Sequence, residues 1–265
     1  MDRENLNISF EQCRPQLKSF ILRLTASVED AEDIVQDTFI KAFSNIASFK
    51  GESTLKTWIF AIASNLAKDL LKSKKRWPQN VSDICKTAAM TNQQFFEEAM
   101  TIRMTSPQGH FEIKEHITFC FTCVSKSLPL EQHIALLLKE VYEFKVKEIA
   151  EIMDTTEAMV KYHLHVGRSK MVEIFENKCA LINKQGTCHQ CTELNGIFNP
   201  KQKAQEALAK IDLVRDADSK DKEHLFDLRM KIIQNIDPFE SAAAELQLHH
   251  LKHNKGVMDK YLVEV

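Results

Sequence analysis

Four residues in the last third of the chain carry side chains that bind metals or react as thiols. Cys179, Cys188, His189 and Cys191 lie within thirteen residues, and Gly186 allows a tight turn between them. Thiolate and imidazole groups in this number are what a closed tetrahedral zinc site needs. The spacing C-x8-C-H-x-C matches no standard zinc pattern, and His189 between two cysteines is poorly placed to reach the same metal. A zinc site, a thiol redox sensor and structural or inert thiols remain three open interpretations.

A second pair of thiols, Cys120 and Cys123, has C-x-x-C spacing but lies among Phe119, Phe121 and Val124. On a helix these cysteines are one turn apart in apolar surroundings, so we expect them to be buried and inert. The chain has seven cysteines, an odd number, without a recognisable export signal. This composition favours reduced thiols or a metal site over a disulfide framework.

Residues 147–165 have the pattern of a helix-turn-helix. Ala150 is small where two helices cross closely, Thr156 can cap the second helix, and Val160 and Leu164 face inward. The outer face would then present Glu157, Ala158, Lys161, Tyr162 and His165 to base edges and phosphates. An ordinary packed helical hairpin is the alternative for this pattern taken alone.

Charge is divided unevenly near the start of the chain, although the formal net charge is only -2. Residues 26–37 hold five acids and no base, whereas residues 40–77 hold eight bases against Glu52 and Asp69. The basic part also contains aromatic residues, and its bases on one side suit single-stranded or melted DNA. The alternative is a solvated lysine run that complements a helix dipole.

These residues must be positioned by helices. The chain has only 6 Gly and 6 Pro, and apolar residues recur at intervals of three and four, which predicts an all-α protein. We expect a helical domain over 8–78, a flexible linker over 79–110 with one weak helix around 93–104, a helix-turn-helix domain over 111–178 and a Cys-containing helical extension over 179–265. The polar start and the lack of any eighteen-residue apolar run predict a cytoplasmic protein with no membrane segment.

The order of these segments resembles the extracytoplasmic-function (ECF) sigma factors of the sigma-70 family. The residues that carry the resemblance are 30–39, 49–53, 56–59, 62–65, 128–129 and the helix-turn-helix at 147–165. The resemblance covers about residues 10–178. It implies a sigma-2-like domain that binds polymerase and melts the promoter, followed by a sigma-4-like domain.

The resemblance also implies roles for individual residues. Asp33, Gln36 and Asp37 would dock on the clamp helices of the largest polymerase subunit. The loop 45–53, with Phe49 and Lys50, would capture an extruded base of the minus-ten element. Lys56, Asn65, Lys68 and Lys72 would line the path of the melted strand. Glu157, Ala158, Lys161, Tyr162 and His165 would face the minus-thirty-five element.

The implied partners are core RNA polymerase and promoter DNA, with an anti-sigma factor as a further candidate, and no catalytic residue is expected. Two positions depart from the family pattern. Ser64 stands where an Arg is usual, and Val166-Gly167 replaces a common Arg-Ala. Two DNA contacts expected of the family are therefore missing.

Three other functions would each account for part of the sequence. A stand-alone helix-turn-helix regulator leaves the acidic segment and the region around Trp58 unexplained. A metal- or redox-responsive regulator would use the cysteine cluster, with the extension acting on the rest of the chain. An enzyme built on Cys188, His189 and Cys191 lacks any accompanying general base or substrate-binding motif.

Overall fold

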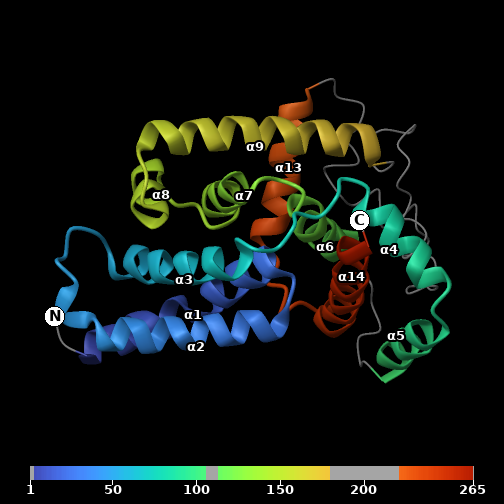
Figure 1. Cartoon of the computed structure of the whole chain (residues 1–265), viewed down its shortest axis with the longest axis horizontal. Helices are drawn as coiled ribbons and strands as arrows, with labels where there is room; N and C mark the ends of the chain where they lie inside the picture. Colours follow the sequence, from blue (N-terminus) through green and yellow to red (C-terminus); the bar gives the residue numbers. More distant parts are fainter. Residues whose placement is uncertain (1–2, 106–112, 180–220, 265) are drawn as a thin grey trace. The chain divides into compact units, whose positions relative to one another are not determined.

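The computed structural model describes residues 3–105, 113–179 and 221–264, and its elements are helices (Figure 1). The all-α prediction is confirmed. In chain order the elements are α1 (Arg3–Thr25), α2 (Val28–Ser44), η1 (Ile46–Ser48), α3 (Leu55–Leu71), α4 (Val81–Met90), α5 (Gln93–Thr105), α6 (Ile113–Ser125), α7 (Leu130–Leu136), η2 (Leu137–Val141), α8 (Val146–Met153), α9 (Glu157–Lys178), α13 (Lys222–Gln234) and α14 (Ala244–Glu264).

The chain divides into two compact units. The first contains Met1–Arg76 and Leu128–Arg168, and the second contains Trp77–Ser127 and Ser169–Val265. Each unit is therefore assembled from two separate stretches of sequence. Helix α9 contributes its first part to the first unit and its last part to the second.

In the first unit, α1, α2 and α3 pack against one another. The apolar stripe predicted for α2 supplies part of this core, because Ile34 and Val35 are buried. On α3 the buried apolar side chains include Ile59, Phe60 and Ala63, of which only Ile59 belongs to the stripe that the sequence predicts. Helix α1 adds Leu17 and Phe20, both fully buried. The periodic pattern of the sequence thus identified the packed face of α2, whereas most of the stripe predicted for α3 is only partly buried.

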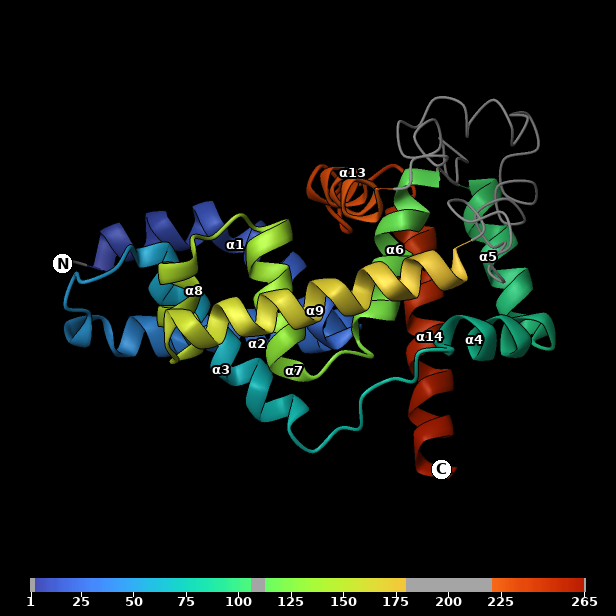
Figure 2. The same cartoon turned by 90° about the horizontal axis from the view of Figure 1, so that it is seen from above.

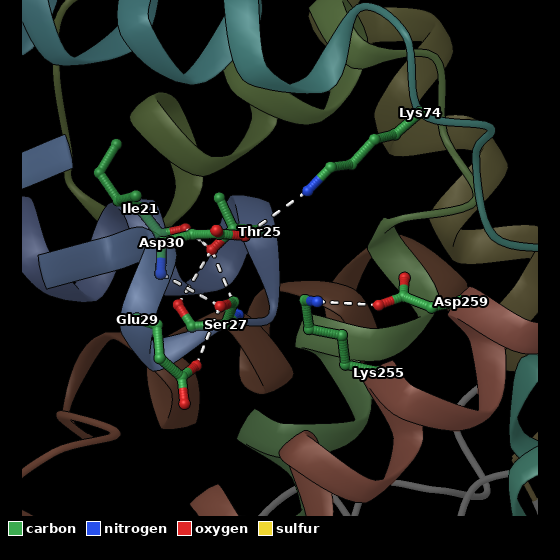
Figure 3. Close-up of polar contacts among 8 residues, drawn as sticks. All are labelled: Ile21, Thr25, Ser27, Glu29, Asp30, Lys74, Lys255 and Asp259. Atoms are coloured by element: carbon green, nitrogen blue, oxygen red, sulfur yellow. Dashed lines mark hydrogen bonds and ion pairs between the residues drawn. The ribbon is translucent and has the colours of Figure 1, made fainter. Parts of the chain in front are cut away.

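The start of α2 is defined by a side-chain cap (Figure 3). Ala26 takes a left-handed conformation with φ 58°, which reverses the chain after α1. Ser27 Oγ then accepts the N–H of Asp30 at 3.1 Å, satisfying a donor that no helical carbonyl can reach. The carboxylate of Asp30 also pairs with Lys74 Nζ at 3.6 Å. The acids at this helix start suit the positive end of its dipole.

The same unit contains the helix-turn-helix, formed by α8 and the start of α9. Asp154 ends α8 in a left-handed conformation with φ 53°, and Thr156 Oγ1 accepts the N–H of Met159 at 3.2 Å. Thr156 therefore caps the second helix as predicted. Ala150 and Val160 are buried between the helices, and Leu164 is partly buried.

In the second unit, α14 packs against α4, α5 and α6, and α13 packs against α6 (Figure 2). The sequence predicted one weak helix in the linker, around 93–104, and the structure contains α5 there. It also contains α4, which the sequence pattern did not reveal. Both linker helices are held by tertiary contacts to α14, which is how short helices of low intrinsic stability persist.

Within the part of the chain that the structure describes, no helix is both long enough and apolar enough to cross a membrane.

Candidate polymerase and nucleic-acid interfaces

The acidic face of α2 carries the predicted polymerase-binding residues. Asp33, Gln36 and Asp37 are all exposed and share one side of the helix, opposite the buried Ile34 and Val35. Positions 33, 36 and 37 are neighbours on a helix surface because they are three and four residues apart. The structure therefore brings these three residues together on one accessible face.

Sequence reasoning missed an apolar residue beside this face. Ile40 lies one turn after Gln36 and Asp37 and is 52% exposed. Its spacing of three and four from those residues could have revealed it, but isolated apolar residues are common on protein surfaces. Ile40 gives the acidic face an apolar border.

The outer side of α9 carries the predicted promoter-reading residues. All five are exposed: Glu157, Ala158, Lys161, Tyr162 and His165. Val160, on the opposite side, is fully buried. Tyr162 is 55% exposed and projects a large aromatic ring from a face that also carries a cation, Lys161. This is a suitable surface for phosphates and base edges.

The predicted minus-ten loop is closed at its base by two aromatic rings. The ring of Phe49 lies 5.3 Å from that of Trp58, measured between centroids, and both side chains are partly buried. Lys50 is exposed, and Gly51 takes φ 74° with open space around it. Thr54 Oγ1 accepts the N–H of Thr57 at 3.1 Å and so caps α3 at the end of the loop.

The four residues predicted to line the melted strand do not share one accessible face. Asn65 and Lys72 are exposed, and Lys72 pairs with Asp69 at 2.8 Å. Lys68 is instead partly buried, and its Nζ donates to the carbonyl of Met153, at the end of α8, at 3.0 Å. Burial lowers the pKa of Lys68.

Lys56 is also engaged by the helix-turn-helix part of the first unit. Its Nζ lies 5.0 Å from the centre of the Phe144 ring and 5.9 Å from that of Phe60. Two of the four side chains predicted to contact the melted DNA strand, Lys56 and Lys68, are thus engaged by other parts of the protein. The sequence could not reveal this, since residues more than eighty positions apart make the contacts.

The structure describes both positions that depart from the family pattern. Ser64 is completely buried, so a long cationic side chain has no room at this position. A Cβ atom added to Gly167 would lie 3.4 Å from Gln132 of α7, an ordinary contact distance, so the structure gives no steric reason for a glycine there. Packing therefore accounts for the serine and not for the glycine.

The cysteine predictions have mixed outcomes. Cys123 is buried, and burial raises the pKa of its thiol to about 12, as expected of an inert thiol, whereas Cys120 is only partly buried. Cys179 is partly buried, and its Sγ accepts a hydrogen bond from Arg229 at 3.5 Å. Cys188, His189 and Cys191 lie outside the described residues. The described residues contain no group of three metal-binding side chains, so the zinc site stays a prediction.

Comparison with known proteins agrees with this arrangement. Residues 9–77 match the family model for sigma-70 region 2, and residues 119–171 match that for sigma-70 region 4. These two matches, in the order of the family's regions, define a sigma-70-type transcription factor. The curated relatives that the chain matches are ECF sigma factors, which agrees with the resemblance seen in the sequence.

Three relatives illustrate the match. The ECF RNA polymerase sigma-E factor of Haemophilus influenzae is 29% identical over 178 residues, which cover 67% of this chain and 88% of the relative. The sigma-E factor of Escherichia coli K12 is 29% identical over 67% of this chain and 87% of its own length. SigG of Mycobacterium tuberculosis is 26% identical over 64% of this chain and 48% of its own length.

Among solved structures, the chain is similar to the sigma factor RpoE from Bartonella quintana, crystallised with the anti-sigma factor NepR. The sequence identity is 19% and the TM-score is 0.42, over 65% of this chain and 97% of that chain.

Proposed function

We propose that this chain directs RNA polymerase to chosen promoters, binding the polymerase and the minus-ten element through its first region and the minus-thirty-five element through its helix-turn-helix. The observation that carries the proposal is the presence of both sigma-70 regions in one chain, in family order. No catalytic residue is required, since the polymerase performs the chemistry. An anti-sigma factor stays a predicted partner.

Polymerase docking is assigned to the acidic face of α2. The support is the shared, exposed position of Asp33, Gln36 and Asp37, with Ile40 at its border. Such a combination of charge and apolar contact suits a specific protein interface, because charges steer encounter and apolar burial adds affinity.

Promoter reading is assigned to the outer face of α9, where Lys161, Tyr162 and His165 would contact phosphates and base edges. The loop 45–53 would hold an extruded minus-ten base, with Phe49 and Trp58 forming its aromatic floor. Asn65 and Lys72 are exposed for the melted strand, whereas Lys56 and Lys68 would need to leave their present contacts.

A pull-down with purified bacterial core RNA polymerase tests the proposal. The full chain should retain the polymerase, and the variant Asp33→Lys/Asp37→Lys should lose it, because charge reversal converts complementarity into repulsion. The bound polymerase is quantified on a gel.

A matched control reverses two exposed acids with the same spacing on α13, Glu223→Lys/Asp227→Lys, and should bind polymerase like the wild type. If the wild-type chain retained no polymerase, the sigma-factor function would be wrong and a stand-alone helix-turn-helix regulator would remain. Equal loss in both variants would remove the assignment to α2.

A further inference from the structure

The two ends of the segment between α3 and α7 meet. In the second unit, the backbone N–H of Trp77 donates to the carbonyl of Lys126 at 3.2 Å, and Lys126 Nζ lies 4.7 Å from the centre of the Trp77 ring. In the first unit, Arg76 Nε donates to the carbonyl of Leu128 at 2.6 Å. Arg76 and Leu128 are therefore held together within the first unit, and Trp77 and Lys126 are held together within the second.

The C-terminal extension holds this segment folded. On α5, the buried ring of Phe95 stacks on His253 of α14, with 4.0 Å between centroids, and on His249, at 4.9 Å. On α4, the Cys85 thiol donates to the carbonyl of Asn254 at 3.9 Å. Both linker helices are thus attached to the same stretch of α14.

Helix α14 is attached to α6 as well. The carboxylate of Glu115 accepts the backbone N–H of Ala243, directly before α14, at 2.9 Å, and this carboxylate is buried. The side-chain amide of Asn254 donates to the Cys123 sulfur at 3.7 Å. One helix of the extension therefore joins the linker to the helix that precedes the helix-turn-helix.

The folded linker limits how far the helix-turn-helix can move away from α3. Residues 77–112 would span up to about 120 Å if fully extended and would average roughly 33 Å end to end as a flexible coil. With Trp77 held against Lys126, the linker cannot span these distances. A flexible linker would let the helix-turn-helix separate from α3, whereas the folded linker keeps them together.

Promoter recognition demands such a separation. Their names place the minus-ten and minus-thirty-five elements about 25 base pairs apart, which is roughly 85 Å along the duplex at 3.4 Å per base pair. In the first unit the helix-turn-helix packs directly on α3, with Lys68 Nζ 3.0 Å from the carbonyl of Met153. A chain in this arrangement cannot place α3 and α9 on both elements at once.

We propose that α14 is an intramolecular clip, which keeps the linker folded on α6 and the helix-turn-helix closed over α3, and that promoter binding requires its release. This inference rests on the proposed function, because only a chain that bridges two promoter elements has to open. The clip acts by keeping the effective concentration of the helix-turn-helix at α3 high.

Single-molecule energy transfer in the free full-length chain tests the clip. Dyes attached at azide-bearing residues introduced at exposed positions 44 and 151 report the distance between α2 and α8. The wild type should show mainly the short distance, since minor conformations are typically 0.1–10% populated. Phe95→Ala removes the ring that holds α5 to α14, so it should raise the long-distance population roughly tenfold. Phe96→Ala, which alters an exposed ring on the same helix, is the control.

A locking variant tests the same idea from the opposite side. Cys123→Ala/Asn254→Cys allows a disulfide between positions 254 and 85, which would fasten α14 to α4 when diamide is added. Promoter-dependent transcription with core polymerase should fall on oxidation and return with dithiothreitol. Adding Cys85→Ala should abolish this redox response.

An unchanged distance distribution in Phe95→Ala, with helical content retained, would overturn the clip, and so would full transcription by the oxidised variant. These outcomes are separate from a failure of the proposed function, which appears as loss of polymerase binding by the wild type.

Discussion

The two compact units bury different kinds of polar side chain. In the first unit, the buried polar residues are mostly hydroxyls, of which Thr25 and Thr38 donate to helix carbonyls one turn earlier; Arg23 and His133 are the exceptions. The second unit buries more ionisable groups: Glu115, His116, Lys126, Arg229 and His250. The first core depends chiefly on apolar packing, whereas the second also depends on the protonation state of its interior.

Removing an aromatic ring from the first core should have the largest effect on stability. Phe60 is fully buried and contacts the rings of Phe20, Tyr142 and Phe144. Phe60→Ala should lower the free energy of unfolding by about 3–5 kcal/mol. Urea unfolding measures the change, and a loss below 1 kcal/mol would contradict the importance given to this cluster.

Acid should destabilise the second unit. Burial lowers the pKa of His116 to about 4 and that of His250 to about 3, the latter with help from His249, His116 and His253. Below about pH 6.5 the unfolded chain binds protons that these buried imidazoles do not, so stability falls as the pH falls. The expected loss is about 1.4 kcal/mol per pH unit for each residue until its folded pKa is reached.

Denaturant titrations at pH 7 and pH 5 check this expectation. The variant His116→Phe should show a shallower pH dependence than the wild type, because one of the two buried imidazoles is gone. The same slope in both proteins would mean that His116 binds its proton equally well in the folded and the unfolded chain, which would contradict the lowered pKa.

The smallest effects concern helix caps at the surface of the first unit. Thr156→Ala removes the acceptor for the N–H of Met159 and should cost about 1 kcal/mol, with faster hydrogen exchange at the start of α9. For comparison, Asp259→Ala removes the exposed ion pair with Lys255 in the second unit (Figure 3) and should cost no more than about 0.5 kcal/mol. Equal decreases in the free energy of unfolding of the two variants would show that the Thr156 cap contributes little.

This contrast also explains what could be predicted from the sequence. The stripe of α2 and the helix-turn-helix were recognisable, because aliphatic residues at helical spacing mark a packed face. On α3 the pattern was less informative, since the fully buried Phe60 and Ala63 lie outside the predicted stripe. Helix α4 was missed although Val81, Ile84 and Cys85 stand at helical spacing, because the polar residues after Pro78 favoured a flexible linker. The engagement of Lys56 and Lys68 by α8 and Phe144 is a long-range contact that no local pattern encodes.

The discontinuity of the first unit has a consequence for its synthesis. Helices α1–α3 are complete once Arg76 has been made, but two of the ring partners of Phe60, Tyr142 and Phe144, arrive only with residues 128–168. At roughly 5–20 residues per second, the intervening 92 residues take about 5–18 s. During this interval the nascent chain displays an apolar surface that its own later residues will cover, so this surface is where a ribosome-associated chaperone would bind.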